Sequence, residues 1–350
     1  MVAASTRRPL FGSLEATPLN DSGAPPFAAY EADEEEEDRE QDIDLAFELP
    51  QHQWRGIDPG TPPSDAPVRF IDGSIYTRTA GSLTVAYRRR PMIAAVVSAA
   101  SLVLDGRTLR RGAGAQAKKL LCLYSDGIDP SVIADAKNAL ARSGIDLLAR
   151  ESKLPLRDFD ATRRATRALA MEVMENAEKD VLFADPQTPS LVDGLLERRL
   201  AAAATHDLSA VGLVKRQMQQ YLPGNLQELL YTLKPGQRTP AFVLKTVQHV
   251  DVVNTYVRLS AQPGMSPSYG VVRLQAPLTY VQRAHGGDLD AYLSGLAAYV
   301  FKLRHRDLAY GRAGISVEPI VRVEDHLHAI VPDVEVLVKK LHHLFAHSGG

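Results

Sequence analysis

The chain has 350 residues, of which 45% are hydrophobic and 23% charged, the composition of an ordinary globular protein. No apolar run approaches the roughly 18 residues of a membrane span, and Arg7 and Arg8 are not followed by the apolar core of a secretory signal, so we expect a cytoplasmic protein. The single cysteine, Cys122, lies between leucines and excludes an internal disulfide and a zinc–thiolate cluster.

The net charge of -2 is unevenly distributed. Residues 1–63 contain four arginines and fourteen acids, a balance of -10, so the remainder carries +8, because -2 minus -10 is +8. A basic body suits a protein that handles a polyanion. The run Glu31–Asp38 repels itself and has almost nothing to bury. We therefore predict a disordered acidic extension over residues 1–53, followed by one domain over residues 54–350.

From Val68 the apolar pattern becomes regular. Strands are expected at Phe70–Ile71, at Leu83–Tyr87 and within Met92–Leu104, in an antiparallel meander. Helices are expected over Lys118–Arg150, with breaks at Pro130 and Gly144, and over Asp158–Lys179, where apolar residues recur at helical spacing.

The second half alternates between strand and helix patterns. A strand at Val181–Ala184 is expected directly after the long helix, then a helix over Leu191–Ala204 and a strand over Leu208–Val214 that ends at Lys215. The later helices are expected over Tyr221–Leu233, Asp288–Leu303 and Val334–Phe345, and the later strands over Pro240–Val247, Thr255–Leu259 and Val271–Leu274. This order predicts an α/β fold, with a mixed sheet flanked by helices.

Two of the predicted strands end in an acid. Asp72 is followed by Gly73-Ser74, and Asp185 is followed by Pro186. Taken alone, each is more simply a residue that closes a turn by hydrogen-bonding its own backbone. Taken together, they hold two carboxylates at the ends of strands.

Further candidate ligands come from a helix and from the C-terminal region. Glu172 lies near the border of the apolar face of the 158–179 helix, and Glu175 is its rival because the helix register is open within one turn. His326 follows near the C-terminus. Three carboxylates and one imidazole could hold two Mn²⁺ ions, with Mg²⁺ as the alternative, since a histidine nitrogen favours Mn²⁺. Two such ions suit the hydrolysis of a phosphodiester.

These segments resemble the motifs of the NurA family of nucleases in order and spacing, over roughly residues 54–345. Phe70–Ser74 is similar to the first acidic motif, Val181–Asp185 to the second aspartate strand, and Glu172 to the helical glutamate before it. The remaining motifs are an apolar strand ending in lysine, at Val211–Arg216, and a C-terminal motif with a histidine, at Glu318–His326.

The resemblance implies an RNase H-like core and a Mn²⁺-dependent deoxyribonuclease, with single-stranded endonuclease and 5′-to-3′ exonuclease activity on DNA ends. It implies a homodimer that acts with a HerA-type hexameric ATPase in double-strand-break resection and repair. Carried over by position, Asp72, Glu172, Asp185 and His326 become the metal ligands, and Lys215 becomes a phosphate or transition-state contact.

Two positions depart from the family pattern. Pro186-Gln187 follows Asp185 where a glycine and a small residue are usual, and Glu318 stands where the family commonly has tyrosine. Together with the acidic extension and the basic body, these departures keep open a non-catalytic adaptor that binds DNA and a motor ATPase. The paired acids also suit a third alternative, a metal-dependent phosphatase of small substrates. Clusters of basic residues, among them Arg88-Arg89-Arg90 and Arg110-Arg111, are candidate phosphate contacts.

Overall fold

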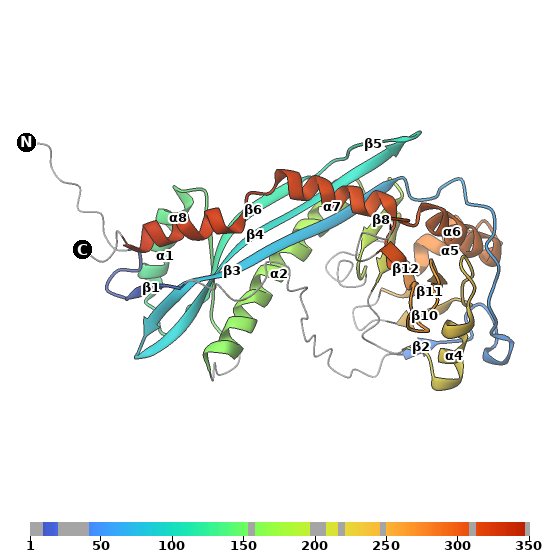
Figure 1. The fold of residues 1–350 in the computed structure, drawn as a ribbon, viewed down its shortest axis with the longest axis horizontal. Helices are drawn as coiled ribbons and strands as arrows, with labels where there is room; N and C mark the ends of the chain where they lie inside the picture. Colours follow the sequence, from blue (N-terminus) through green and yellow to red (C-terminus); the bar gives the residue numbers. More distant parts are fainter. Residues whose placement is uncertain are drawn as a thin grey trace, which may run out of the picture.

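A mixed sheet of twelve strands runs through the part of the chain that the computed structural model describes, which is residues 10–19, 42–152, 158–196, 208–215, 221–245, 250–307 and 313–346. The strand order is β2-β10-β11-β12-β9-β8-β3-β4-β6-β7, with β1 paired to β3 and β5 paired to β4. Helices flank this sheet, so the predicted mixed α/β architecture is confirmed (Figure 1).

β1, β3, β4, β6 and β7 belong to the elongated half of the molecule, and β2, β10, β11 and β12 to a more compact lobe at the opposite end (Figure 1). The strands are β1 (Ala16–Pro18), β2 (Asp42–Asp44), β3 (Arg69–Val85), β4 (Arg88–Asp105), β5 (Thr108–Arg111), β6 (Gln116–Tyr124), β7 (Asp146–Arg150), β8 (Ser190–Asp193), β9 (Ala210–Val214), β10 (Phe242–Lys245), β11 (Val252–Arg258) and β12 (Val271–Pro277).

The helices cover both faces of the sheet. They are α1 (Pro130–Ala141), α2 (Phe159–Phe183), α4 (Gly224–Thr232), α5 (Leu278–Ala284), α6 (Leu289–Leu303), α7 (Glu318–Ile330) and α8 (Val334–Ala346), with short 3₁₀ turns at Gln51–Gln53 and Ala313–Ile315. Among the residues described, no helix has both the length and the apolar character needed to cross a bilayer.

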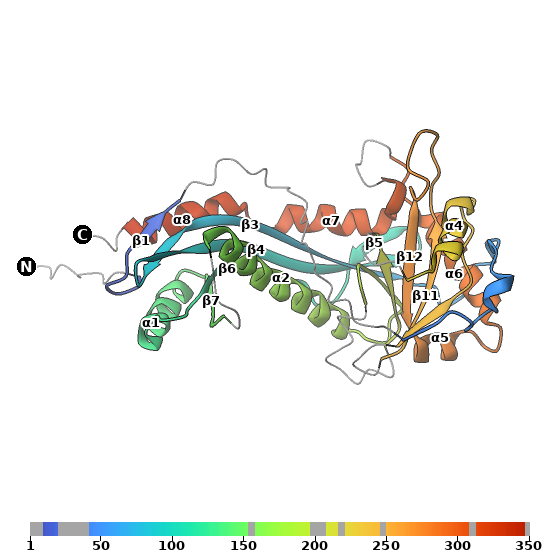
Figure 2. The same cartoon turned by 90° about the horizontal axis from the view of Figure 1, so that it is seen from below.

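The β3–β4 hairpin forms the long axis of the molecule. Its strands have 17 and 18 residues and stay paired from Arg69 opposite Val103 to Val85 opposite Arg88. Figure 2 shows α2 on one side of this hairpin, and α7 followed by α8 on the other. Strand residues alternate between faces, so one hairpin can bury apolar side chains against both layers.

Three parallel strands join the hairpin to the compact lobe. Ile71 of β3 pairs with Val192 of β8, which pairs in turn with Gly212 of β9. Phe70, Leu191 and Leu213 on one face belong to the core that α5, α6 and α7 cover, whereas Ile71, Val192 and Ala210 on the other face pack with α2 and α4. The carboxyl-terminal end of β8 therefore lies beside the first residues of β3, close to the amino-terminal end of that long strand, with β9 on the other side of β8.

The N-terminal region is packed against the sheet on both sides of the acidic run. Leu10 and Phe11 are buried and β1 pairs with β3, while β2 pairs with β10. Glu48 accepts hydrogen bonds from the buried guanidinium of Arg238 at 2.6 and 2.8 Å. The predicted disorder is therefore wrong for residues 10–19 and 42–53, because these segments have apolar and ionic partners in the sheet. The run 31–38 lies outside the described residues.

The sequence assigned the wrong element to three segments. Val181–Ala184 is the last turn of α2 and not a strand, because Ala177, Val181 and Leu182 continue the buried face of that helix. The predicted helix at 118–150 is β6, α1 and β7, since Leu120–Leu123 is buried by β4 beside it. Of the helix predicted at 191–204, residues 191–193 belong to β8, and 197–204 lie outside the described residues.

Cys122 behaves as the small buried apolar residue that its leucine neighbours predicted. It is fully buried in β6, and burial raises the pKa of its thiol to about 12. Since the thiolate is the reactive form, this cysteine is chemically inert in the folded protein.

Candidate metal centre

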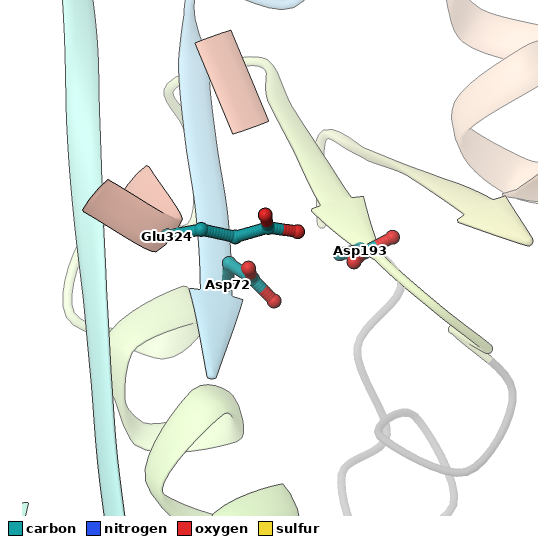
Figure 3. Close-up of side chains that lie close together, drawn as sticks. All are labelled: Asp72, Asp193 and Glu324. Atoms are coloured by element: carbon teal, nitrogen blue, oxygen red, sulfur yellow. The ribbon is translucent and has the colours of Figure 1, made fainter. Parts of the chain in front are cut away.

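Three carboxylates from distant parts of the chain meet at the junction of the hairpin and the compact lobe. Asp72 of β3, Asp193 at the end of β8 and Glu324 of α7 each offer an oxygen within 4.8 Å of the other two. Figure 3 shows the three side chains converging from two neighbouring strands and a helix. Carboxylate oxygens at such spacing are the ligands that Mg²⁺ and Mn²⁺ bind.

The register of the parallel strands places the two aspartates side by side. Ile71 and Val192 form the last residue pair between β3 and β8, and the next residue of each strand is the aspartate. Both aspartates are followed by glycine, and Gly194 has a φ of 94°, which turns the chain away at the end of β8. Asp193 lies at the carboxyl end of its strand, whereas β3 continues past Asp72 to Val85, so the prediction that a strand ends at Asp72 is wrong because β4 stays paired with β3 beyond that point.

Glu324 reaches the cluster from the face that α7 turns to the sheet. Ile320, Val323 and Leu327 of that helix are buried in the core shared with Phe70 and Leu213. Glu324 lies between them on the helix surface and is half-buried. Packing of the apolar face therefore fixes the position of the carboxylate.

Lys215 supplies the positive charge of the centre. Its Nζ donates to Oδ2 of Asp193 at 2.8 Å and lies 3.6 Å from Oε1 of Glu324, and its side chain is only 8% exposed. Burial lowers the pKa of this ammonium, but attraction to Asp193, Asp72 and Glu324 outweighs burial and the pKa is raised overall. Lys215 is therefore held charged between the carboxylates.

One ammonium does not balance the negative charge. The pKa of Asp72 is raised well above its ordinary value, first by burial and then by repulsion from Asp193, with Glu178 and Glu324 adding to it and Lys215 opposing it. A bound divalent cation would relieve this repulsion and replace the lost hydration of the carboxylates. The donor set and the charge excess both fit a hard divalent cation.

Glu178 is a fourth carboxylate at the edge of this centre. It is buried on α2, and a Cβ placed on Gly73 would lie 2.6 Å from its Oε1, so glycine at position 73 is what allows the helix carboxylate this close to β3. Glu178 lies outside the three-carboxylate group and acts on Asp72 by repulsion.

The structure brings together two of the five residues that the sequence selected, Asp72 and Lys215. Asp185 instead closes the turn between α2 and β8, where its carboxylate accepts from Thr188 Oγ1 at 2.7 Å and its carbonyl oxygen accepts from Arg69 at 2.8 Å. The predicted strand that would have carried Asp185 is the end of α2, which moves the second strand-end aspartate to Asp193.

Glu172 and His326 also lie outside the group of converging ligands found among the described residues. Glu172 forms a two-pronged pair with Arg150 on the surface, at 2.7 and 2.9 Å. His326 follows Glu324 by two residues, which turns it roughly 200° around the helix. Glu318, at the position of the usual tyrosine, pairs with His305 and with Arg322. Glu175, the rival of Glu172, is not a member of the group either.

The sequence around Asp193 has the same pattern as the sequence around Asp72. Leu191-Val192-Asp193-Gly194 repeats the pattern of Phe70-Ile71-Asp72-Gly73, two apolar residues followed by aspartate and glycine. Glu324 carries a weaker signal, an acid placed between the apolar positions of an amphipathic helix.

An aromatic pair adjoins the carboxylates. Tyr76 is four residues beyond Asp72 on the same strand face, His328 is one helical turn beyond Glu324, and their rings meet edge to face with centroids 5.9 Å apart. Burial raises the pKa of Tyr76, a hydrogen bond with Ser74 lowers it in part, and repulsion from Glu324 raises it further. The two rings thus lie further along β3 and α7 than the carboxylates, on the same face of the sheet.

The sequence matches no protein-family model and no curated protein.

Proposed function

We propose that this protein is a divalent-metal-dependent nuclease that hydrolyses phosphodiester bonds of DNA. The observation that carries the proposal is the convergence of Asp72, Asp193 and Glu324 within 4.8 Å, with Lys215 bonded into the same group. Divalent cations held by carboxylates supply positive charge for the phosphoryl oxygens and lower the pKa of bound water.

The proposed roles follow from the positions of the side chains. The three carboxylates hold the cation, and the Lys215 ammonium is placed to stabilise negative charge on a phosphoryl oxygen. Phe70, Leu191 and Leu213 form an apolar floor on the same sheet face, which excludes water and strengthens these electrostatic interactions. His326 was expected to favour Mn²⁺, but all the ligand atoms of this centre are carboxylate oxygens. Mg²⁺ and Mn²⁺ are therefore equally suitable.

Two features favour a nucleic acid over a small phosphate ester. The Tyr76–His328 pair offers a ring surface on which a base can stack beside the reacting phosphate. The chain beyond residue 63 carries a net charge of +8, as derived above. The resemblance to NurA nucleases extends the proposal to an RNase H-like core, 5′-to-3′ polarity, a homodimer and a HerA-type ATPase partner, with Asp193 and Glu324 taking the places first given to Asp185 and His326.

A non-catalytic adaptor is the second candidate. Lys215 already bridges Asp193 and Glu324, and a buried ion network of this kind can be purely structural. In that case the centre would stabilise the junction of hairpin and lobe, and DNA would be bound without being cut.

One assay separates these candidates. Purified protein is incubated with 5′-labelled and 3′-labelled single- and double-stranded DNA, and separately with p-nitrophenyl phosphate, in Mn²⁺, Mg²⁺ or EDTA. The nuclease proposal expects metal-dependent DNA cleavage and little phosphatase activity. Glu324→Gln, purified in parallel, controls for contaminating nucleases because it removes one carboxylate of the centre. DNA binding without cleavage would favour the adaptor, and ester hydrolysis without DNA cleavage would favour the phosphatase.

A further inference from the structure

The tip of the β3–β4 hairpin lies at the far end of the molecule from the compact lobe (Figure 1). Val85 and Arg88 form the last strand pair, and Ala86 and Tyr87 make the two-residue turn with φ angles of 48° and 64°. Two consecutive positive φ values are what a type I′ hairpin turn requires, and the residues that favour them are asparagine and glycine.

This turn is unfavourable for the residues that occupy it. They are the only non-glycine residues with positive φ among those described, and neither alanine nor tyrosine has a side chain suited to that region. Tyr87 is 103% exposed, so burial of its ring does not offset the backbone strain. The strained backbone at Tyr87 therefore raises the free energy of the isolated protein, and no contact of the exposed ring offsets this cost. A bound partner could supply the missing contact.

The tip is also cationic. Arg88 and Arg89 follow Tyr87 directly and are both exposed. Arg90 is half-buried and is used within the fold, where it lies 3.6 Å from the carboxylate of Asp126. Among the residues described, neither Arg88 nor Arg89 appears in an ion pair, in contrast to Arg90. A fully exposed aromatic ring beside two exposed guanidinium groups is the chemistry that binds bases and phosphates together.

We propose that the segment Ala86–Arg89 is a second nucleic-acid contact, remote from the metal centre, that holds the DNA whose end is being cut. This inference rests on the proposed nuclease function. From Asp72 to Val85 the strand advances thirteen residues, or roughly 40 Å at about 3.3 Å per residue. A duplex advances about 3.4 Å per base pair, so the tip meets DNA about a dozen base pairs from the carboxylates.

Because the tip lies far from the carboxylates, only a duplex long enough to reach both can show the effect of the tip on binding. Anisotropy binding in EDTA, where no cleavage occurs, compares duplexes of about 8 and about 30 base pairs, below and above the span of roughly 12. The turn variant is Ala86→Asn with Tyr87→Gly, which supplies the favoured turn residues and removes the ring. The charge variant is Arg88→Gln with Arg89→Gln. The matched control, Lys137→Gln with Arg142→Gln, removes the same charge from exposed positions at α1.

Both tip variants should bind the longer duplex roughly tenfold more weakly than wild type and the shorter one equally well, while the control is unchanged. Loss of two phosphate contacts should reduce the slope of log affinity against log salt by about 1.8 in the charge variant. The turn variant should also melt a few degrees higher, which shows that its weaker binding does not come from unfolding.

Three outcomes would overturn the tip contact. If both tip variants bind the longer duplex with the same affinity as wild type, the tip proposal fails and the nuclease proposal stands. If the turn variant changes the molar mass measured by light scattering and leaves DNA affinity unaltered, the tip contacts a protein instead. A wild-type protein that neither binds nor cleaves DNA removes both proposals together.

Discussion

Replacing Asp72 with asparagine should lower metal-dependent DNA cleavage by roughly 10³-fold or more while making the metal-free protein more stable. Activity falls because one of three ligands is lost. Stability rises because the carboxylate is buried among like charges, a cost that asparagine removes while keeping the oxygen that accepts from Gly73 N at 2.8 Å. We therefore expect Asp72→Asn to have a higher free energy of unfolding than wild type in EDTA at neutral pH.

The pH dependence of this gain follows from the raised pKa of Asp72. At low pH the group is protonated in both the folded and the unfolded chain and contributes no penalty. As pH rises above the ordinary pKa, the unfolded chain releases the proton and the folded protein retains it, so stability falls across the interval up to the raised pKa. The difference in unfolding free energy between Asp72→Asn and wild type should therefore grow with pH through that interval.

Glu172→Gln is the matched control for this experiment. It makes the same chemical change at an exposed pair with Arg150, where the contribution to stability is about 0–1 kcal/mol. Its activity should equal that of wild type. An Asp72→Asn protein that is less stable than wild type in EDTA, or that cleaves DNA normally, would contradict the account of the centre.

Replacing Arg69 with alanine should destabilise the protein by about 3–5 kcal/mol. Arg69 is 0% exposed, and its guanidinium donates to the carbonyl oxygens at the end of α2 and in the next turn: Val181, Leu182 at 3.3 Å and Asp185 at 2.8 Å. The guanidinium also donates a hydrogen bond to the carbonyl oxygen of Ala113 at 3.3 Å. Without the side chain these carbonyls lose their partner and a cavity remains.

The same substitution should also weaken the metal centre. Arg69 fixes the turn that begins at Asp185 and leads into β8, the strand that ends at Asp193. Chemical denaturation gives the stability, and Arg150→Ala is the comparison because Arg150 is an exposed arginine paired on the surface. A loss below about 1 kcal/mol for Arg69→Ala would show that these buried bonds are dispensable.

The sequence predicted the parts of the fold that depend on long periodic patterns. The apolar spacing of residues 158–179 identified α2, and the C-terminal pattern at 334–345 identified α8. Asp72 and Lys215 were selected because each follows an apolar run, and Lys215 does follow the end of β9, whereas Asp72 lies inside β3 and not at its end. Local pattern is sufficient where an element is long and periodic.

The rest of the site depends on pairing between distant segments. Ser190–Asp193 is a strand of four residues, and it is extended because β3 and β9 pair with it on both sides. Val181-Leu182 has an apolar composition that suits either a strand or a helix, and its helical state follows from packing on β3. Neither the strand at 190–193 nor the helix at 181–183 can be recognised without knowing which segments pack beside it. The sequence therefore placed the second aspartate at 185, eight positions before Asp193.

The choice of Glu324 over His326 depends on helix orientation. The two residues are separated by one position, and only the burial of Ile320, Val323 and Leu327 shows which of them faces the sheet. Helix orientation also decides which glutamate of α2 faces β3: Glu178 is buried next to Gly73, whereas Glu172 is paired with Arg150 on the surface.

Calorimetric titration of the EDTA-stripped protein with Mn²⁺, and separately with Mg²⁺, tests most directly whether Asp72, Asp193 and Glu324 form a cation site. The account predicts saturable binding of at least one ion per chain by wild type and by Glu172→Gln, and loss of that binding in Asp193→Asn. Binding that persists unchanged in Asp193→Asn, or the absence of binding by wild type, would contradict it.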